Sequence, residues 1–338
     1  MDANAIVCDA QQNLSLTRVR LPAPTAEDIV IRTVYSGVSP GTELALLQNK
    51  IRWGPYPLCT GYQAVGVIEA VGDNVSAFAP GQRVYYRSNV GMMSDRGDAI
   101  SAVSGTHCSH AVVQPGKAGV TRLPDGVDPA TASLFVMPAV GLAGVDMANP
   151  RMGDVVVVHG CGPIGLGVVA ACAHRGCRVI AVDIDDDRLE RASALGADHL
   201  INSSQRPAEE QIADLLPDGT NGADVVFEST GLPQCIDPAI RLCRPYGTFV
   251  WQGNYGEHPI QMRFLEPHAR RLTMYFPCDD GGPPCRQAVL KNMAVGALPW
   301  QHTITHRVEP TEAVALYHRM LKDQAADLVS AVIKWSDA

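Results

Sequence analysis

The chain has 338 residues, of which 46% are hydrophobic and 18% charged, the composition of an ordinary globular protein of about two domains. The formal net charge is −8 and no basic cluster occurs, so nucleic acid and anionic membranes are excluded as expected partners. The first residues contain neither a basic segment nor a long apolar run, so we expect no signal peptide, no membrane span and a cytoplasmic location.

Up to about residue 122 the sequence predicts a compact β-rich region. Short segments rich in Val, Ile and Tyr, separated by turn residues, are expected to form strands at 27–35, 63–72 and 82–86. A long loop is expected after the third strand, and its Met92-Met93 pair either lines a substrate or is disordered. A helix is expected over 130–147.

Ten cysteines are scattered along the chain, and no two of them form a Cys-x-x-Cys pair. Closely spaced cysteine pairs are typical of metal-binding knuckles, and small secreted proteins use dense cysteine frameworks for disulfides. Neither pattern is found, so we expect free, mostly buried thiols in a reducing compartment.

Four consecutive valines at 155–158 lead into a Gly-x-Gly-x-x-Gly turn, and the apolar segment after this turn predicts a helix. The first glycine permits a tight turn, the second permits close approach of a pyrophosphate, and the third permits close packing of helix and strand. The helix N-terminus attracts the anion. An ordinary strand-to-helix turn is the alternative. The expected dinucleotide contacts are Gly160, Gly162, Pro163, Ile164 and Gly165.

Asp183 ends the next predicted strand, 178–182, and follows Gly165 by 18 residues, near the spacing at which an acid binds the adenosine ribose. Its carboxylate would accept hydrogen bonds from the ribose hydroxyls and repel a 2′-phosphate, which favours NAD over NADP. Arg188, which follows in the same turn, keeps NADP as an alternative cofactor. It is included among the expected cofactor contacts. Asp183 could instead cap a helix.

Helices and strands alternate after Asp183, which predicts an α/β fold with a doubly wound parallel sheet. Helices are expected over 188–195 and from residues 208 and 235, and strands at 199–201, 223–228, 247–251 and 272–276. A final strand is expected at 330–335. Thr230 and Gly253 follow two of these strands and complete the predicted cofactor contacts.

The order of these features resembles the medium-chain dehydrogenase/reductase superfamily. The resemblance rests on the β-rich start, the glycine turn, Asp183 and the turn Glu228-Ser229-Thr230-Gly231, and Gly81-Gln82-Arg83-Val84 adds to it. It covers essentially the whole chain. It implies a GroES-like catalytic domain over 1–148 and 277–338 and a Rossmann domain over 149–276.

The segments that hold catalytic zinc in the metal-dependent relatives differ here. The corresponding segments are Gly37-Val38-Ser39, Gly61-Tyr62-Gln63 and Phe135-Val136-Met137-Pro138, so the ligand positions hold Ser39, Tyr62, Gln63 and Met137. Zn²⁺ prefers thiolate, imidazole or carboxylate. The structural-zinc loop of the relatives has four cysteines, whereas Cys108 is alone here. The resemblance therefore implies a zinc-free member.

Two zinc-free groups are relevant. Quinone oxidoreductases and enoyl reductases usually use NADPH. The bacteriochlorophyllide hydroxyethyl dehydrogenases resemble the chain more closely, although their Rossmann turn departs from the glycine pattern seen here. That similarity lies in Ser36-Gly37-Val38-Ser39-Pro40-Gly41-Thr42-Glu43, Gly61-Tyr62, Thr305-His306-Arg307 and Ile333-Lys334-Trp335-Ser336-Asp337-Ala338. The resemblance implies oxidation of a secondary alcohol to a ketone.

Without zinc, another group must bind the alcohol oxygen and move its proton. Tyr62 takes the position of the lost histidine, and a phenol of lowered pKa near positive charge can act as acid or base. Gln63 would orient the substrate oxygen, and Ser39 and Thr42 would complete the catalytic group. Tyr62 could instead be structural, Gln63 could merely pack, and Glu43 is expected to be structural. His107 and His110 are expected in the core or at the surface, with a position at the cleft as the alternative.

Three functions remain open. The first is NAD-dependent, zinc-independent oxidation of a secondary alcohol in a polyol, a sugar derivative or a ring-bearing natural product. The second is NADPH-dependent reduction of a quinone or enone. The third is a non-catalytic NAD-binding sensor. The expected partners are a small alcohol or ketone and further copies of the chain, in a homodimer or homotetramer.

Overall fold

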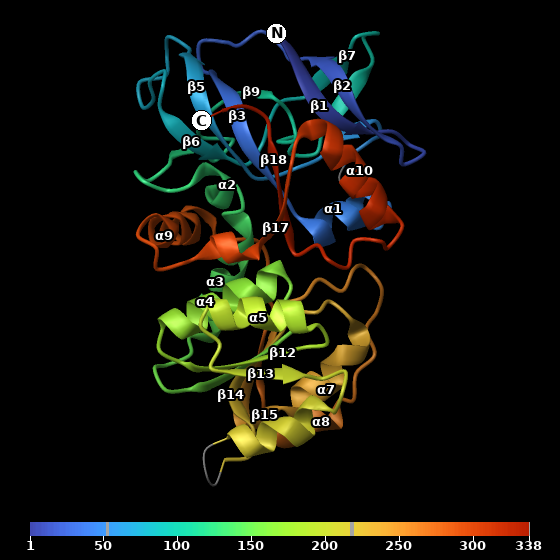
Figure 1. The fold of residues 1–338 in the computed structure, drawn as a ribbon, viewed down its shortest axis with the longest axis vertical. Helices are drawn as coiled ribbons and strands as arrows, with labels where there is room; N and C mark the ends of the chain where they lie inside the picture. Colours follow the sequence, from blue (N-terminus) through green and yellow to red (C-terminus); the bar gives the residue numbers. More distant parts are fainter. Residues whose placement is uncertain (52–53, 217–219, 338) are drawn as a thin grey trace. The chain divides into compact units, whose positions relative to one another are not determined.

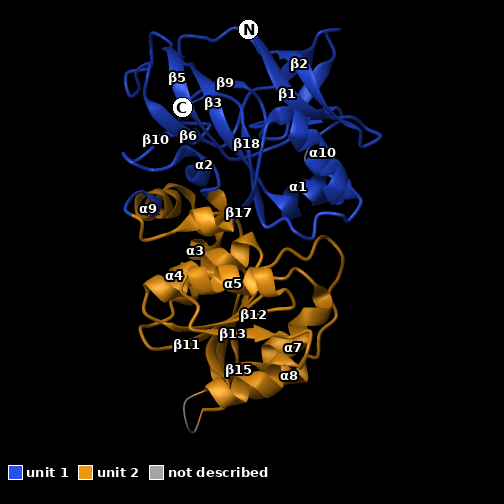
Figure 2. Cartoon of the chain, viewed as in Figure 1, with its two compact units in different colours: residues 1–135, 293–295, 304–338 blue, residues 136–292, 296–303 orange. Residues whose placement is uncertain are grey.

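The computed structural model describes residues 1–51, 54–216 and 220–337, which form two compact units (Figures 1 and 2). Unit 1 consists of residues 1–135, 293–295 and 304–338, and unit 2 consists of residues 136–292 and 296–303. The first unit therefore contains both ends of the chain, and the second is inserted between them. The domain limits expected from sequence, 148/149 and 276/277, differ from these boundaries and stay a prediction.

Five strands of unit 1 close into a small barrel in the order β1-β2-β7-β8-β4. They are β1 (Asp2–Cys8), β2 (Leu14–Arg20), β4 (Leu58–Cys59), β7 (Met92–Ser94) and β8 (Ala99–Ala102). Strands β7 and β8 lie in the segment expected to be a loop, so the alternative of a disordered Met92-Met93 segment is wrong. Met92 is buried in the barrel core, while Met93 is exposed.

A second, mostly antiparallel sheet completes the β-structure of unit 1, in the order β10-β6-β5-β3-β18-β17 with β9 paired to β3. Its strands are β3 (Ile29–Val38), β5 (Ala64–Val71), β6 (Arg83–Tyr86), β9 (His110–Val113), β10 (Thr121–Arg122), β17 (Ile304–Val308) and β18 (Ser330–Lys334). Strand β18 pairs with β3, which joins the C-terminal segment to the N-terminal part of the chain.

The helices of unit 1 are α1 (Pro40–Leu47), α2 (Pro129–Ala132) and α10 (Pro310–Leu321). Helix α10 is amphipathic, and its apolar side, which includes Leu316 and Met320, packs into a core shared with Leu46 and Leu47 of α1. This packing positions α1 and α10 for the polar contacts described below.

Unit 2 is built on a six-stranded, fully parallel sheet in the order β13-β12-β11-β14-β15-β16. Its strands are β11 (Val155–His159), β12 (Arg178–Asp183), β13 (His199–Asn202), β14 (Ala223–Glu228), β15 (Cys243–Trp251) and β16 (Thr273–Tyr275). Every residue of β11 is buried, as expected for a valine-rich strand at the centre of a parallel sheet. The predicted doubly wound α/β fold is confirmed.

Helices cover both faces of this sheet, with α4 and α5 on one face and α7 and α8 on the other (Figure 1). The helices of unit 2 are α3 (Val136–Ala148), α4 (Pro163–His174), α5 (Asp186–Ala194), α6 (Ala208–Ile212), α7 (Ile236–Arg241), α8 (Leu265–Arg270) and α9 (Gly282–Ala294), with 3₁₀ turns at Ala213–Leu215, Pro233–Cys235 and Trp300–Thr303. In the described parts of the chain, no helix is long and apolar enough to cross a membrane.

The helix expected over 130–147 is divided into α2 and α3, with a turn at 133–135. Pro138 explains this break, because its nitrogen carries no hydrogen for the carbonyl of Leu134 and its ring would clash with that carbonyl in a continuous helix. The expectation of one uninterrupted helix was wrong at this point.

Candidate functional site

The glycine turn of unit 2 joins β11 to α4, and two of its positions, 160 and 165, require glycine. Gly160 has a φ of +98°, which favours glycine. A Cβ on Gly165 would lie 1.8 Å from the carbonyl oxygen of Gly160, so no side chain fits there. A Cβ on Gly162 would meet no protein atom within 4 Å. The protein's own packing therefore does not require glycine at 162, and the open space fits a cofactor that approaches the backbone.

Helix α4 begins at Pro163, with Gly162 as N-cap and no side chain capping its first turn. The backbone N–H groups at this end are thus available for an anion, and the helix dipole adds positive potential. Ile164 is half-buried in the same turn. The arrangement suits the pyrophosphate of a dinucleotide.

Asp183 ends β12 beside the glycine turn and is buried. Its Oδ2 accepts a hydrogen bond from the backbone N–H of Cys161 at 2.6 Å, and its Oδ1 accepts one from the N–H of Ile184 at 2.8 Å. Oδ1 also accepts the N–H of Asp185 at 3.2 Å. The carboxylate therefore links two loops at the carboxyl edge of the sheet, and acceptor capacity for a ligand is left on Oδ2. Its role toward a ribose stays a prediction.

Arg188 lies in the first turn of α5, with its Nε 4.0 Å from Oδ2 of Asp185. The side chain of Asp185 also caps this helix by accepting the backbone N–H of Arg188. The cap that was the alternative for Asp183 is thus provided by Asp185. A contact between Arg188 and the cofactor stays a prediction.

Thr230 and Gly253 lie at the same edge of the sheet. A Cβ on Gly160 would come within 2.9 Å of the Thr230 nitrogen, and one on Gly253 would come within 2.6 Å of the Gly231 nitrogen. The loops after β11, β14 and β15 therefore converge. In sheets with this strand order, ligands bind at the carboxyl edge where the order reverses, here between β11 and β14.

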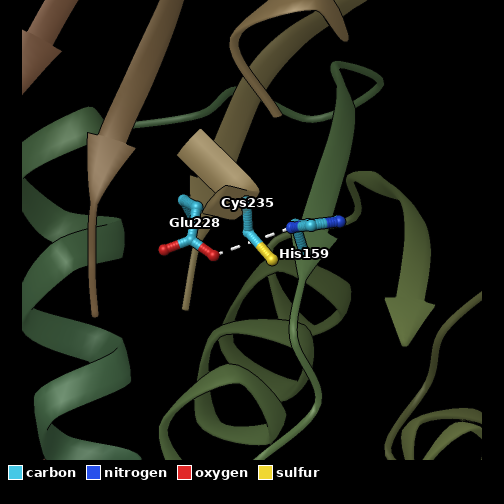
Figure 3. A group of neighbouring side chains, drawn as sticks. All are labelled: His159, Glu228 and Cys235. Atoms are coloured by element: carbon cyan, nitrogen blue, oxygen red, sulfur yellow. Dashed lines mark ion pairs between the residues drawn. The ribbon is translucent and has the colours of Figure 1, made fainter. Parts of the chain in front are cut away.

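Three side chains that the sequence does not suggest as metal ligands meet at this edge. Potential ligand atoms of His159, Glu228 and Cys235 all lie within 4.8 Å of one another, and Figure 3 shows the side chains pointing toward one another. His159 Nδ1 is 3.6 Å from Glu228 Oε1. Imidazole, carboxylate and thiolate are the donors that zinc prefers, so the group could hold a metal ion.

The carboxylate of Glu228 already has several partners in this structure. It accepts hydrogen bonds from the backbone N–H of Thr230 at 3.0 Å and from the hydroxyls of Thr230 and Tyr255. Burial alone raises the pKa of this carboxyl, but the contacts with His159, Thr230 and Tyr255 outweigh burial and lower the pKa. Glu228 is therefore stabilised as a carboxylate without any metal.

In unit 1 the structure brings three of the predicted catalytic residues together. The hydroxyl of Tyr62 donates a hydrogen bond to Oγ of Ser39 at 2.5 Å, and Thr42 also interacts with this phenol. Burial raises the pKa of Tyr62 to about 12, although the bonds to Ser39 and Thr42 act in the opposite direction. The expectation of a lowered pKa is thus wrong for the protein by itself, because burial dominates.

Two further groups adjoin Tyr62. The guanidinium of Arg87 lies 5.6 Å from the centre of the Tyr62 ring, which places a positive charge next to the phenol. Gln63 is fully buried, and its backbone oxygen accepts the N–H of Gly37 at 3.0 Å. The role expected for the Gln63 side chain, orienting a substrate oxygen, stays a prediction.

A buried polar network lies behind this group and includes Glu43, His107 and Tyr317. His107 Nε2 is 2.9 Å from Glu43 Oε2, and the hydroxyl of Tyr317 donates to the same carboxylate. His107 is fully buried and so lies in the core, one of the two positions expected for it, while His110 is half-buried near Glu69. Tyr317 could not be found from the sequence, because it is one of several apolar residues of an amphipathic helix.

Comparison with known proteins agrees with this architecture. Residues 25–142 match the model of the alcohol dehydrogenase GroES-like domain, and residues 163–279 match that of the zinc-binding dehydrogenase family. The erythritol/L-threitol dehydrogenase of Mycolicibacterium smegmatis is 29% identical over 337 residues, covering 91% of both chains. A "Putative D-xylulose reductase" of Rhizobium meliloti is 32% identical over 293 residues, covering 80% of this chain and 82% of the relative.

The chain belongs to the medium-chain dehydrogenase/reductase superfamily. Solved structures share its fold over nearly their whole length. A "putative zinc-binding dehydrogenase" from Sinorhizobium meliloti 1021, bound to NADP, has a TM-score of 0.85 at 21% identity and covers 99% of both chains. The 2R,3R-butanediol dehydrogenase of Bacillus subtilis has a TM-score of 0.83 at 21% identity, covering 98% of this chain and 99% of the other.

Many members of this superfamily contain a catalytic zinc ion. The residues found here at the expected ligand positions are poor zinc ligands. Ser39 and Tyr62 are hydrogen bonded to each other, Gln63 is an amide, and Met137 is a buried thioether in α3 of unit 2. None of these is a thiolate, imidazole or carboxylate. The group of His159, Glu228 and Cys235 has suitable donors, but it lies at the dinucleotide edge of unit 2 and not in these segments.

Proposed function

We propose that the protein is an NAD(P)-dependent dehydrogenase that interconverts a secondary alcohol and a ketone. The glycine turn, Asp183 and the free end of α4 support the cofactor assignment. The names of the relatives, which act on erythritol, threitol and xylulose, support an alcohol substrate of the polyol or sugar-derivative type. A ring-bearing natural product, as in the bacteriochlorophyllide dehydrogenases, stays within the proposed substrate range.

The observation that carries the proposal is the cluster of three hydroxyls formed by Tyr62, Ser39 and Thr42. The family resemblance implies that these segments take the place of zinc-ligand segments. Bound NAD(P) would accept the hydride and its electron pair from the carbinol carbon. The hydroxyl proton of the alcohol must then leave by a protein group. Tyr62 is suited to this role, because its oxygen can accept the substrate proton while its own proton passes to Ser39 Oγ, and the proton already on Ser39 then leaves to solvent.

The raised pKa of Tyr62 decides which form of the phenol takes part. At neutral pH the phenol is protonated, so it can donate a proton to the oxygen of a ketone directly. In the oxidation direction, the transfer to Ser39 avoids a free phenolate. The positive charge of Arg87 would favour this transfer.

We further propose that the reaction needs no zinc and that NAD is preferred to NADP. The neutral donors at the ligand positions support the first statement, and Asp183 supports the second by repelling a 2′-phosphate. The relative with NADP bound shares only the fold at 21% identity, so it does not oppose this preference.

A panel of secondary alcohols, polyols and sugar alcohols incubated with NAD and followed at the NADH absorbance tests the proposal. Alcohol-dependent reduction of NAD is the expected result. Reduction of enones or quinones by NADPH, with no alcohol oxidised, would favour the reductase alternative, and tight NAD binding with no turnover would favour the sensor. The homodimer or homotetramer and the cytoplasmic location stay predictions.

A further inference from the structure

The first turn of α1 has an unusual division of hydrogen bonds. Ser39 is the N-cap residue, but its side chain makes no capping hydrogen bond. A serine at this position ordinarily accepts a backbone N–H of the first turn through its Oγ. Here Oγ accepts the hydroxyl of Tyr62 at 2.5 Å instead. The helix therefore leaves the Ser39 hydroxyl to Tyr62.

Glu43 makes the hydrogen bonds to the backbone of Ser39 at the start of this helix. Its Oε1 accepts the backbone N–H of Ser39 at 2.8 Å, and the Glu43 N–H donates to the Ser39 carbonyl at 3.0 Å. Two hydrogen bonds thus fix the backbone of Ser39 on both sides. The negative charge of Glu43 also lies in the first turn of the helix, where the dipole favours it.

The second oxygen of Glu43 is held by one residue of α10 and by two residues of loops. Oε2 accepts from the hydroxyl of Tyr317 in α10 and from Thr60 Oγ1 at 3.2 Å, and it lies 2.9 Å from His107 Nε2. His107 is in turn fixed by Ser36, whose Oγ is 2.8 Å from Nδ1. The side chains of Glu43, His107 and Tyr317 are at most 1% exposed.

The donors around the buried carboxylate of Glu43 hold its side chain in a single conformation. Burial raises the pKa of the Glu43 carboxyl, but the contacts with His107, Tyr317 and Ser39 outweigh burial and lower it. The charge and its hydrogen bonds keep the side chain from moving, since any shift would leave a buried ion without partners.

We infer that Glu43 is a positioning residue for the proton transfer by Tyr62, acting through Ser39 and itself held by His107 and Tyr317. The inference rests on the proposed function, in which Tyr62 transfers the proton. Glu43 contacts no reacting atom in this scheme. Its effect is to hold the Ser39 hydroxyl where the phenol of Tyr62 can deliver its proton.

A double-mutant cycle on the full-length enzyme tests the inference with Glu43→Gln, Tyr62→Phe and both together. We expect Glu43→Gln to lower kcat about tenfold, with the KM of the alcohol and the Kd of NAD changed less than about twofold. In the Tyr62→Phe background the same substitution should change kcat by less than about twofold, because the hydroxyl that Ser39 serves is already absent.

Glu69→Gln is a matched control, since Glu69 is a half-exposed glutamate of the same unit, 3.3 Å from Arg32, and has no contact with Tyr62. Its kcat should equal that of the wild type. Amide hydrogen exchange of the segment that contains Ser39 adds a readout independent of activity. Glu43→Gln should speed exchange there, because the Ser39 N–H loses a charged acceptor.

If the Glu43→Gln variant does not fold, Tyr317→Phe takes its place in the cycle. This substitution removes one hydrogen-bond donor to Glu43 and leaves the carboxylate intact. We expect a smaller fall in kcat that again vanishes in the Tyr62→Phe background. Equal losses in both backgrounds would overturn the inference and leave the proposed function standing. Full turnover by Tyr62→Phe would instead defeat the proton role of Tyr62, and with it this role of Glu43.

Discussion

The hydroxyl of Tyr62 lies 2.5 Å from Oγ of Ser39, and both residues stand at positions where the family resemblance led us to expect zinc ligands. A hydroxyl pair of this kind can relay a proton but provides no strong Lewis acid. If this pair moves the substrate proton, substitutions in it should change turnover and leave cofactor binding by unit 2 nearly unchanged.

Replacing Tyr62 with Phe should lower kcat by about 10² to 10⁴-fold, the usual contribution of general acid-base catalysis, while the Kd of NAD stays nearly unchanged. Steady-state kinetics and NAD titration measure both quantities. Tyr35→Phe, which deletes the hydroxyl of a half-buried tyrosine in β3, should have little effect. Near-full turnover by Tyr62→Phe would transfer the proton role to Thr42 or to a water held by Gln63.

Ketone reduction should lose no rate between about pH 7 and about pH 9 through Tyr62. Reduction needs the protonated phenol, and burial raises its pKa to about 12, so the acid form persists across this window. Initial rates with NADH and a ketone product measure the profile. A loss of rate near neutral pH that Tyr62→Phe abolishes would show that the phenol ionises there.

NAD should bind more tightly than NADP by about 1 kcal/mol or more, which is about fivefold in Kd. Asp183→Asn should reduce this ratio, because it removes the charge that repels a 2′-phosphate, whereas Asp187→Asn at an exposed position of α5 should leave it unchanged. Calorimetric titration gives both constants. Tighter binding of NADP by the wild type would contradict the assignment.

The purified protein should contain less than one zinc per chain and should keep its activity in a chelator, since no zinc-preferred donor stands at the expected ligand positions. Elemental analysis and activity assays measure the two quantities. If zinc is found, Cys235→Ser tells whether it sits at His159, Glu228 and Cys235. One tightly held zinc lost together with activity would refute zinc independence.

Two glycines of the same turn should respond differently to alanine. Gly165→Ala should destabilise unit 2 by about 1–3 kcal/mol or more, because the new Cβ would lie 1.8 Å from a carbonyl oxygen. Gly162→Ala should change stability by about 1 kcal/mol or less, as its Cβ meets no protein atom, yet raise the Kd of NAD about tenfold or more. Unchanged NAD affinity in Gly162→Ala would show that the pyrophosphate lies elsewhere.

Patterns that are local in the chain could be predicted from sequence. The valine strand, the glycine turn and the position of Asp183 depend on residues a few places apart, and hydrophobic periodicity fixes which face they bury. The strands β12 and β14 were therefore expected almost at their observed limits. The break between α2 and α3 is also encoded locally, by Pro138.

Only the tertiary structure decided which polar side chains meet. Tyr317 and Glu43 are 274 residues apart, and they meet because α10 packs on the core that also holds α1. His159 and Glu228 meet because the parallel strands β11 and β14 bring their carboxyl ends to one edge, and the 3₁₀ turn after β14 brings Cys235 to them. The sequence by itself determined the two folds, the glycine turn and the absence of zinc donors at the expected positions. Packing determined the raised pKa of Tyr62, because burial depends on neighbours that are distant in the chain.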